Sequence, residues 1–210
     1  EPIDPVRFMS NYSSGKMGYE IAIAAKNMGA SVKLISGPVS LKSIKDVETE
    51  YVETSDEMFN AVMSNADNFD ILISTAAIAD YKPKDYSKSK YKKSENDITI
   101  KFTRGADIIS AASKKNNNIY TVGFAAETEA LEKNAQAKLI KKNLDMIVGN
   151  IANHELKLGF ESDFNEVIIV TRDKIQKIAK AKKSDIAASI LQAVSAEYSL
   201  KIKIVNEDVR

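Results

Sequence analysis

The sequence predicts an α/β fold: a three-layer, Rossmann-like, mostly parallel sheet with helices on both faces, plus a C-terminal β-hairpin arm. Between residues 16 and 150, short apolar runs typical of buried strands alternate with segments of helical periodicity. This alternation is typical of parallel sheets that are covered on both sides by helices. Near the C-terminus, two strand-like runs are separated only by Arg172 and Asp173, which predicts the hairpin.

The first half of the chain is expected to begin with a helix over residues 17–28. Its apolar side chains recur at steps of 4, 7, 8 and 11, which gives one stripe, and Gly29 is placed to end it. Strands are expected at 31–36 and 48–53, a helix start at 54–57 and a buried strand at 70–75.

The second half is expected to contain three further strands and three further helices besides the hairpin. Strands are expected at 97–103, 119–125 and 145–150, helices at 106–113, 128–142 and 184–196, and hairpin strands at 165–171 and 174–180. Neither repeats nor a linker interrupt the pattern, so residues 1–210 are expected to form a single domain. The chain opens on the turn EPIDP, and the strand expected to precede such a turn is missing.

Composition excludes several classes of function. The net charge of +1 provides no general attraction to nucleic acids or anionic membranes. The absence of cysteine excludes disulfides, thiolate metal sites and a cysteine nucleophile, and it suits a reducing cytoplasm. The sequence lacks a run of 18 apolar residues, so we expect no membrane partner.

The stretch SNYSSGKMG, residues 10–18, resembles half of a phosphate-binding loop but is not a Walker A motif. Ser13, Ser14 and Gly15 lie just before a helix, where free N–H groups and the helix dipole favour an anion. The alternative is an ordinary serine cap followed by a flexible glycine.

Small residues follow the expected strand at 70–75, in the run TAAIADY. They leave room for a planar ligand at the edge of the sheet where such folds bind ligands. Asp80 could then accept hydrogen bonds from ribose hydroxyls or serve a metal, although tight helix packing with an aspartate in a turn explains the same spacing.

Two groups of lysines could meet phosphates. Residues 82–93 hold six lysines with two tyrosines between them, which fits a lid over phosphates, a nucleic-acid strip or a solvated loop. Lys138 and Lys142 lie four apart on one helix face, where a triphosphate could supply their counter-charge. Surface lysines favoured by the helix dipole are the alternative. The lone His154 has no partner pattern and is not expected to act as an acid or base.

The chain resembles the bacterial phosphopantothenate–cysteine ligase family, the phosphopantothenoylcysteine synthetase half of the coenzyme A biosynthesis bifunctional protein. The resemblance spans nearly the whole chain. It is carried by the runs EPIDPVRFMSNYSSGKMG, SGPVSL, TAAIADY, KYKK, ADII, VGFAAET, KLIKKNLDMIVGN and GFESDFNEV. Gly105-Ala106 replaces the Asn-Pro of many members.

The resemblance implies a ligation in two steps. The carboxylate of 4′-phosphopantothenate attacks the α-phosphate of CTP, and pyrophosphate leaves an acyl-cytidylate. The amine of L-cysteine then displaces CMP and gives 4′-phosphopantothenoylcysteine. Mg²⁺ accompanies CTP, with metal ligands unknown, and no flavin site is expected in this domain. The resemblance also implies a homodimer, possible fusion to or assembly with a flavin-dependent decarboxylase, and a cytoplasmic location.

The resemblance also implies roles for individual residues. Asn11 stabilises the acyl-cytidylate, Lys90 is the lid lysine, and Arg7 lies near the acidic groups of the substrate, as do Ser13, Ser14 and Gly15. The implied nucleotide contacts are Ser74, Thr75, Ala76, Asp80, Lys90, Ala106, Asp107, Ile108, Ile109, Phe124, Lys138 and Lys142.

Two alternative functions stay open at this point. A nicotinamide-dependent oxidoreductase would need G-x-G-x-x-G after a first strand, and the visible glycines do not fit that spacing. A nucleic-acid-binding module would rely on residues 82–93, but the near-neutral charge argues against it.

Overall fold

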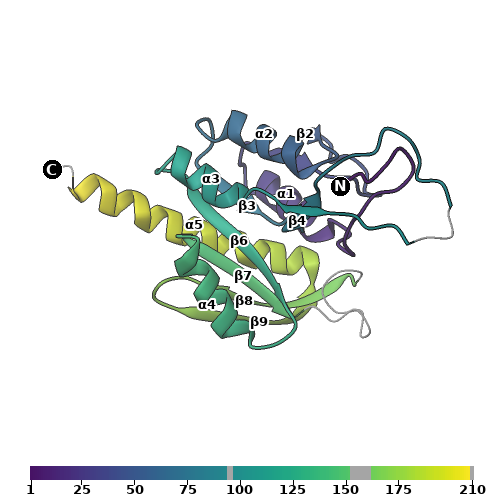
Figure 1. Cartoon of the computed structure of the whole chain (residues 1–210). Coiled ribbons are helices and arrows are strands. Elements are labelled where there is room, and N and C mark those ends of the chain that lie inside the picture. The colour runs from purple at the N-terminus through teal and green to yellow at the C-terminus, as the bar shows by residue number, and fades with distance from the viewer. Residues whose placement is uncertain (94–96, 152–161, 209–210) are drawn as a thin grey trace.

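The protein is described by a computed structural model that covers residues 1–93, 97–151 and 162–208, with side chains up to residue 203. A central five-stranded sheet has the order β3-β6-β7-β8-β9 (Figure 1). Its first three strands are parallel and its last two continue antiparallel. The strands are β3 (Ile71–Ser74), β6 (Tyr120–Glu127), β7 (Met146–Ile151), β8 (Phe164–Val170) and β9 (Ile175–Lys182).

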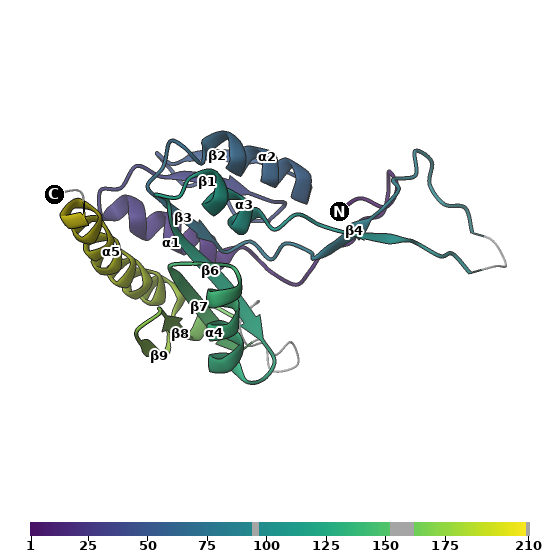
Figure 2. The same ribbon diagram turned by 60° about the vertical axis from the view of Figure 1, so that its left-hand side comes forward.

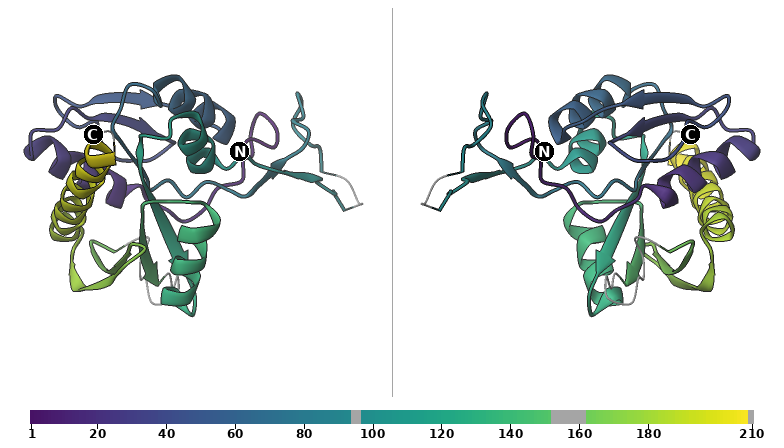
Figure 3. Two further views of the ribbon diagram at one scale, coloured as in Figure 1. Left: turned by 90° about the vertical axis from the view of Figure 1, so that its left-hand side faces the viewer. Right: turned by 90° about the vertical axis from the view of Figure 1, so that its right-hand side faces the viewer.

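Two smaller sheets flank the central sheet. A parallel pair joins β1 (Lys33–Ser36) to β2 (Glu48–Tyr51). An antiparallel pair joins β4 (Tyr81–Pro83) to β5 (Phe102–Arg104), and residues 84–93 and 97–101 between them protrude from the body as an arm (Figures 2 and 3).

Helices cover both faces of the central sheet. The long helix α5 (Lys183–Asp208) packs beside α1 (Lys16–Asn27) over one face, and α4 (Leu131–Lys141) lies on the other (Figure 1). The helices α2 (Ser55–Asn65) and α3 (Ile108–Lys115) pack against each other near β1 and β3. The expected three-layer fold is confirmed.

The core follows the period of two that a strand imposes on its side chains. Val122 and Val148 face α1 and α5, where they meet Ile186. Ile147 and Ile168 point to the opposite face and pack with residues of α4. Both faces of the central strands are therefore buried, which explains why their sequences read as continuous apolar runs.

Most expected elements are present, but some of their bounds differ. The strand expected at 97–103 is only β5, because its partner β4 is three residues long and offers no longer ladder. The strand β4 itself was not predicted from the lysine-rich sequence. The helix expected from residue 128 begins at Leu131, because Ala130 adopts a left-handed conformation with φ of 48°. The expected C-terminal hairpin is present, and it extends the central sheet.

Within the described ranges, none of the helices combines the length and apolar character that crossing a membrane requires.

Candidate functional site

Two adjoining hollows lie where β3, β6 and β7 end and α1 begins. The first has a volume of about 170 Å³ and extends toward β1. The second has a volume of about 130 Å³ and reaches Phe124 and Asn150. The walls that they share consist of small residues: Ser13, Gly15, Gly18, Thr75, Ala76 and Ala77.

Two glycines let α1 approach the end of β3. A Cβ atom on Gly18 would lie 2.5 Å from the hydroxyl oxygen of Thr75. Gly15 has a φ of 76°, and a Cβ atom there would lie 2.8 Å from a methyl carbon of Val39. The two glycines of the SSGKMG sequence therefore allow α1 to pack closely against the end of β3. The structure also places Ser13, Ser14 and Gly15 on the wall of the second hollow.

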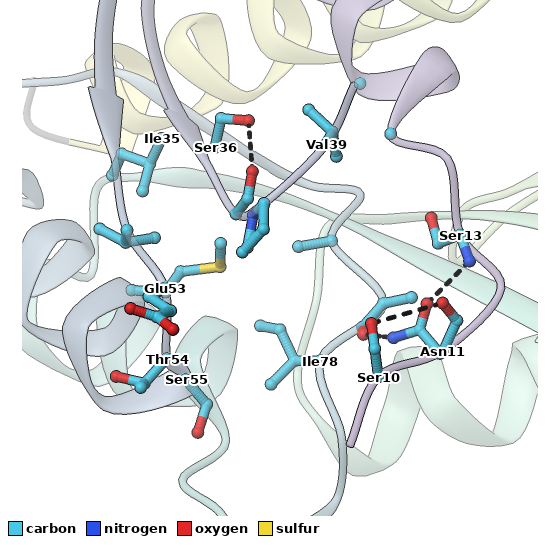
Figure 4. A pocket seen from close by; sticks show the side chains of 18 of the residues that line it. Ser10, Asn11, Ser13, Ile35, Ser36, Val39, Glu53, Thr54, Ser55 and Ile78 are labelled. Carbon is cyan, nitrogen blue, oxygen red and sulfur yellow. Dashed lines mark hydrogen bonds between the residues drawn. The ribbon is translucent and has the colours of Figure 1, made fainter. Parts of the chain in front are cut away.

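Asn11 is held by both ends of its amide at the rim of the first hollow (Figure 4). Its Oδ1 accepts from the backbone N–H of Ser13 at 2.9 Å, and its Nδ2 donates to the carbonyl oxygen of Ala77. The side chain therefore bridges the loop before α1 and the segment after β3. This arrangement fixes the orientation of the amide while the residue remains exposed.

Arg7 lies outside both hollows, and its guanidinium pairs with the buried carboxylate of Asp4. Its Nε and Nη2 donate to Asp4 Oδ2 at 2.9 and 2.5 Å. The Arg7 guanidinium holds the pKa of Asp4 well below its usual range, although burial alone would raise it. Arg7 Nη2 also donates to the carbonyl oxygen of Tyr91 at 3.2 Å. This arginine thus ties the N-terminal segment to the arm, instead of reaching into either hollow.

Lys90 is exposed on the arm and lines neither hollow. The next residue, Tyr91, is anchored because its N–H donates to Asp4 Oδ2 at 3.2 Å. The structure therefore fixes one point of the arm to the N-terminal segment, and the arm extends away from the body of the molecule (Figure 2).

Asp80 and the start of α3 meet at one point. The N–H of Gly105 donates to the carbonyl oxygen of Asp80 at 2.8 Å, which brings Ala106 and Asp107 beside it. Asp107 caps α3 by accepting from Ser110 N at 3.3 Å. Burial raises the pKa of Asp107, but the ion pair with Lys142 at 3.0 Å and the hydrogen bonds with Ser110 together outweigh it, so the pKa is lowered.

Ile108 and Ile109 were expected to contact the nucleotide, yet their side chains lie in the core at 5% and 6% exposure. Only their backbone N–H groups, in the first turn of α3, are placed to face a ligand. Ser74 is the last residue of β3 and pairs with Gly123 of β6.

Lys138 is paired with Glu127, the last residue of β6. The two charged groups lie 2.5 Å apart, and Glu127 also accepts from Asn134 Nδ2 at 3.0 Å. Carboxylates therefore supply a counter-charge to both Lys138 and Lys142 in this structure, and the expected contact of these lysines with a triphosphate stays a prediction. Glu127 was missed from the sequence, where the available signal was an acidic residue at the end of a buried strand.

Metal ligands are not clustered in the part of the chain that the structure describes: no three His, Asp or Glu side chains there could hold an ion together. His154 lies outside the described residues.

Comparisons with known proteins agree on one family. Residues 1–198 match the family described as DNA/pantothenate metabolism flavoprotein C-terminal domain. The chain is 44% identical over 195 residues to the coenzyme A biosynthesis bifunctional protein CoaBC of Vibrio parahaemolyticus. It is 43% identical over 198 residues to the CoaBC protein of Bacillus subtilis. These matches cover 91% and 93% of this chain but 49% and 48% of the relatives, so the chain spans about half their length.

Solved structures share the fold. A crystal structure of the C-terminal domain of CoaBC superposes with a TM-score of 0.78 at 37% identity, covering 96% of this chain and 90% of that one. A Cab2 mutant in complex with phosphopantothenate-cysteine superposes with a TM-score of 0.80 at 14% identity, covering 98% and 85%. The second likeness concerns the fold alone.

Proposed function

Because this chain belongs to the DNA/pantothenate metabolism flavoprotein C-terminal domain family, we propose that it is a ligase that joins 4′-phosphopantothenate to L-cysteine in coenzyme A biosynthesis. The names of its curated relatives support this pathway. The phosphopantothenate-cysteine in the Cab2 complex, a protein of the same fold, is consistent with the product.

The proposed reaction activates the carboxylate with CTP. A carboxylate oxygen of 4′-phosphopantothenate bonds to the α-phosphorus, and the bond to the bridging oxygen breaks so that its electron pair leaves with pyrophosphate. The amine of L-cysteine then attacks the acyl carbon, loses a proton and displaces CMP. Both steps bring negative groups together, so donors and positive charge must be in place beforehand.

The fixed amide of Asn11 is the observation that carries this proposal. Its contacts with Ser13 and Ala77, which line both hollows, hold it at the rim of the first hollow. An amide can donate to an oxyanion without titrating, which suits a mixed anhydride of a carboxylate and a phosphate. Because the side chain is already oriented, little reorganisation is required when the substrate binds.

Nucleotide binding is assigned to the surrounding strand ends and to two lysines. Thr75, Ala76 and Phe124 line the second hollow, and Asp80, Ala106 and Asp107 meet at the start of α3. Lys138 and Lys142 form ion pairs with Glu127 and Asp107. Mg²⁺ would enter on the triphosphate, since this ion prefers phosphate oxygens and water to an all-protein cage.

The arm that carries Lys90 is proposed as a lid. An acyl-cytidylate is readily hydrolysed, so the site benefits from a segment that excludes water until cysteine arrives. The contact of Tyr91 with Asp4 gives the arm a fixed attachment beside the loop of Asn11. Lys90 would approach the phosphates only when the arm closes.

We further propose that residues 1–210 form a single domain and that this domain assembles as a homodimer. A cytoplasmic location and fusion to, or assembly with, a flavin-dependent decarboxylase fit the bifunctional relatives. No flavin is assigned to this domain.

Pyrophosphate release tests the proposed function. The protein should release pyrophosphate from CTP, and more slowly from ATP, when phosphopantothenate is present and cysteine is withheld. Omitting phosphopantothenate is the control and should abolish release. Absence of release under all conditions, together with calorimetric binding of NADH or of an oligonucleotide, would contradict the proposal in favour of an oxidoreductase or a nucleic-acid-binding module.

A further inference from the structure

The end of β6 carries a carboxylate to which the proposed function gives no role. Glu127 is the last residue of β6, and its side chain is 14% exposed. It directly follows Ala126, which lines the second hollow. A carboxylate that is largely withdrawn from water must be paired or hydrogen-bonded, so the groups that Glu127 holds indicate what it is for.

Both oxygens of Glu127 are engaged by side chains of α4. Its Oε1 accepts from Lys138 Nζ at 2.5 Å, and its Oε2 accepts from Asn134 Nδ2 at 3.0 Å. The Nδ2 of Asn134 also donates to the carbonyl oxygen of Glu129 at 3.1 Å, in the turn that leads into α4. Asn134 therefore fixes the orientation of the carboxylate independently of Lys138.

The pair of Glu127 with Lys138 differs from the pair beside it. Asn134, Lys138 and Lys142 recur at steps of four and therefore lie in one row along α4. Lys142 pairs with Asp107, and these side chains are 36% and 42% exposed, so water screens the interaction. Glu127 is much less exposed, so it restrains its lysine more firmly than Asp107 does.

Lys138 remains available to a ligand while it is paired. Its side chain is 44% exposed, and the bond to Glu127 uses one of the three hydrogens of the ammonium group. A free lysine loses rotamer freedom when it binds a ligand, and this loss weakens binding. A carboxylate that already restrains the side chain reduces the loss, because less freedom remains to be given up.

We propose that Glu127 is a positioning residue, which holds Lys138 where its ammonium group meets the phosphates of the nucleoside triphosphate. The proposal rests on the proposed function, which assigns Lys138 to the nucleotide. Glu127 acts only through Lys138 and does not touch the reacting atoms. If the carboxylate merely competed with the phosphates, its removal would relieve a repulsion and tighten nucleotide binding, so the two explanations predict opposite signs.

The affinity for CTP, measured by titration calorimetry, tests the proposal. Glu127→Ala should weaken CTP binding about fivefold, because the lysine is no longer held in place. Glu127→Gln keeps an oxygen for Asn134 and a neutral acceptor for Lys138, so its affinity should lie between those of Glu127→Ala and the wild type. Glu132→Ala breaks another ion pair of α4, with Lys177 at 2.7 Å, and this matched control should bind CTP as the wild type does.

Steady-state kinetics separate positioning from a structural role. In the Glu127 variants the KM for CTP should rise, while the KM values for phosphopantothenate and cysteine stay unchanged. A purely structural role would lower the midpoint of thermal unfolding without this selective change. If circular dichroism shows that Glu127→Ala does not fold, Glu127→Gln carries the test, since it preserves the size of the side chain.

A double-mutant cycle asks whether Glu127 acts through Lys138. In a Lys138→Met background, Glu127→Gln should cause no further loss of CTP affinity, because the positioned group is already absent. Additive losses would overturn the positioning role.

Failure of this inference is distinguishable from failure of the proposed function. Unchanged or tighter CTP binding in the Glu127 variants, with ligation intact, would overturn the inference alone. CTP binding that depends on Glu127 and Lys138, without any ligation of phosphopantothenate and cysteine, would contradict the proposed function and leave the positioning role standing.

Discussion

At the scale of single residues, Asn11 shows how much a match to a family motif can predict about a site. The resemblance singled it out, and the structure adds the two contacts, to Ser13 and Ala77, that orient its amide. Glu127 could not be predicted in the same way. Its carboxylate meets Lys138 and Asn134 only because the folded chain brings α4 back beside the end of β6.

We predict that Asn11→Asp abolishes ligation while the fold persists. The substitution places a negative charge beside an anionic reaction centre and removes the donor to Ala77. Product formation would be measured by mass spectrometry, and the fold by circular dichroism. Asn117→Asp, at an exposed position, is the matched control and should be fully active. Wild-type turnover of Asn11→Asp would remove Asn11 from the mechanism.

We predict that Asp4→Asn loosens the arm. Asp4 accepts from Arg7 and from the N–H of Tyr91, so losing its charge weakens both attachments. Trypsin should then cleave the lysine-rich arm faster, and the midpoint of thermal unfolding should fall. Asp173→Asn, in an exposed turn, should change neither quantity.

The pairing of Asp4 with Arg7 also predicts that the stability of the protein depends on pH. Its pKa in the folded protein is lowered by Arg7, so its contribution is complete above the unfolded pKa of about 4. That contribution is lost as the pH falls through this value toward the lower folded pKa. The acid-induced loss of stability should therefore be smaller in Asp4→Asn than in the wild type, and equal losses would contradict this role of Asp4.

At the scale of elements, helices and buried strands could be predicted because their periodicity is local. The arm could not, because β4 and β5 form only through each other, across the intervening residues 84–101. The start of α4 also could not be predicted, because it depends on the left-handed backbone conformation of Ala130. An alanine in the sequence does not indicate that conformation.

We predict that two glycines at the ends of α1 respond differently to alanine. Both have positive φ values, 76° for Gly15 and 86° for Gly29, so each substitution should destabilise by about 1 kcal/mol. Gly29 faces open space, whereas a Cβ on Gly15 would meet Val39 at 2.8 Å. Urea unfolding should therefore show a larger loss of stability for Gly15→Ala.

The same two glycine substitutions also distinguish an effect on stability from an effect on activity. Gly15→Ala should also lower ligase activity, because Gly15 lines both hollows, while Gly29→Ala should retain it. Equal effects of the two substitutions on stability and on activity would contradict the close contact proposed for Gly15.

At the scale of the whole molecule, exposed apolar residues gather where the N-terminal segment meets the arm. Val6, Phe8 and Tyr12 are 61%, 69% and 64% exposed. The N-terminal segment contacts the arm, since Ser87 N donates to the carbonyl oxygen of Ile3 at 3.1 Å. Large exposed apolar side chains in adjoining segments are typical of an interface, and this supports the proposed homodimer.

We predict that Phe8→Glu produces a monomer. A charge at the centre of an apolar interface would be buried without a partner. Light scattering after size-exclusion chromatography would measure the mass over a range of concentrations. Ile140→Glu, at a 77% exposed position on α4, is the control and should leave a dimer. A wild-type protein that is monomeric at all concentrations would contradict the proposed assembly.

The most direct measurement of the central claim follows an oxygen atom. Phosphopantothenate labelled with ¹⁸O in its carboxylate should be incubated with CTP, L-cysteine and the protein, and the CMP analysed by mass spectrometry. If the carboxylate attacks the α-phosphorus, CMP acquires one ¹⁸O atom and pyrophosphate acquires none. Unlabelled CMP alongside normal product formation would contradict the acyl-cytidylate, and with it the role proposed for the hollows beside Asn11.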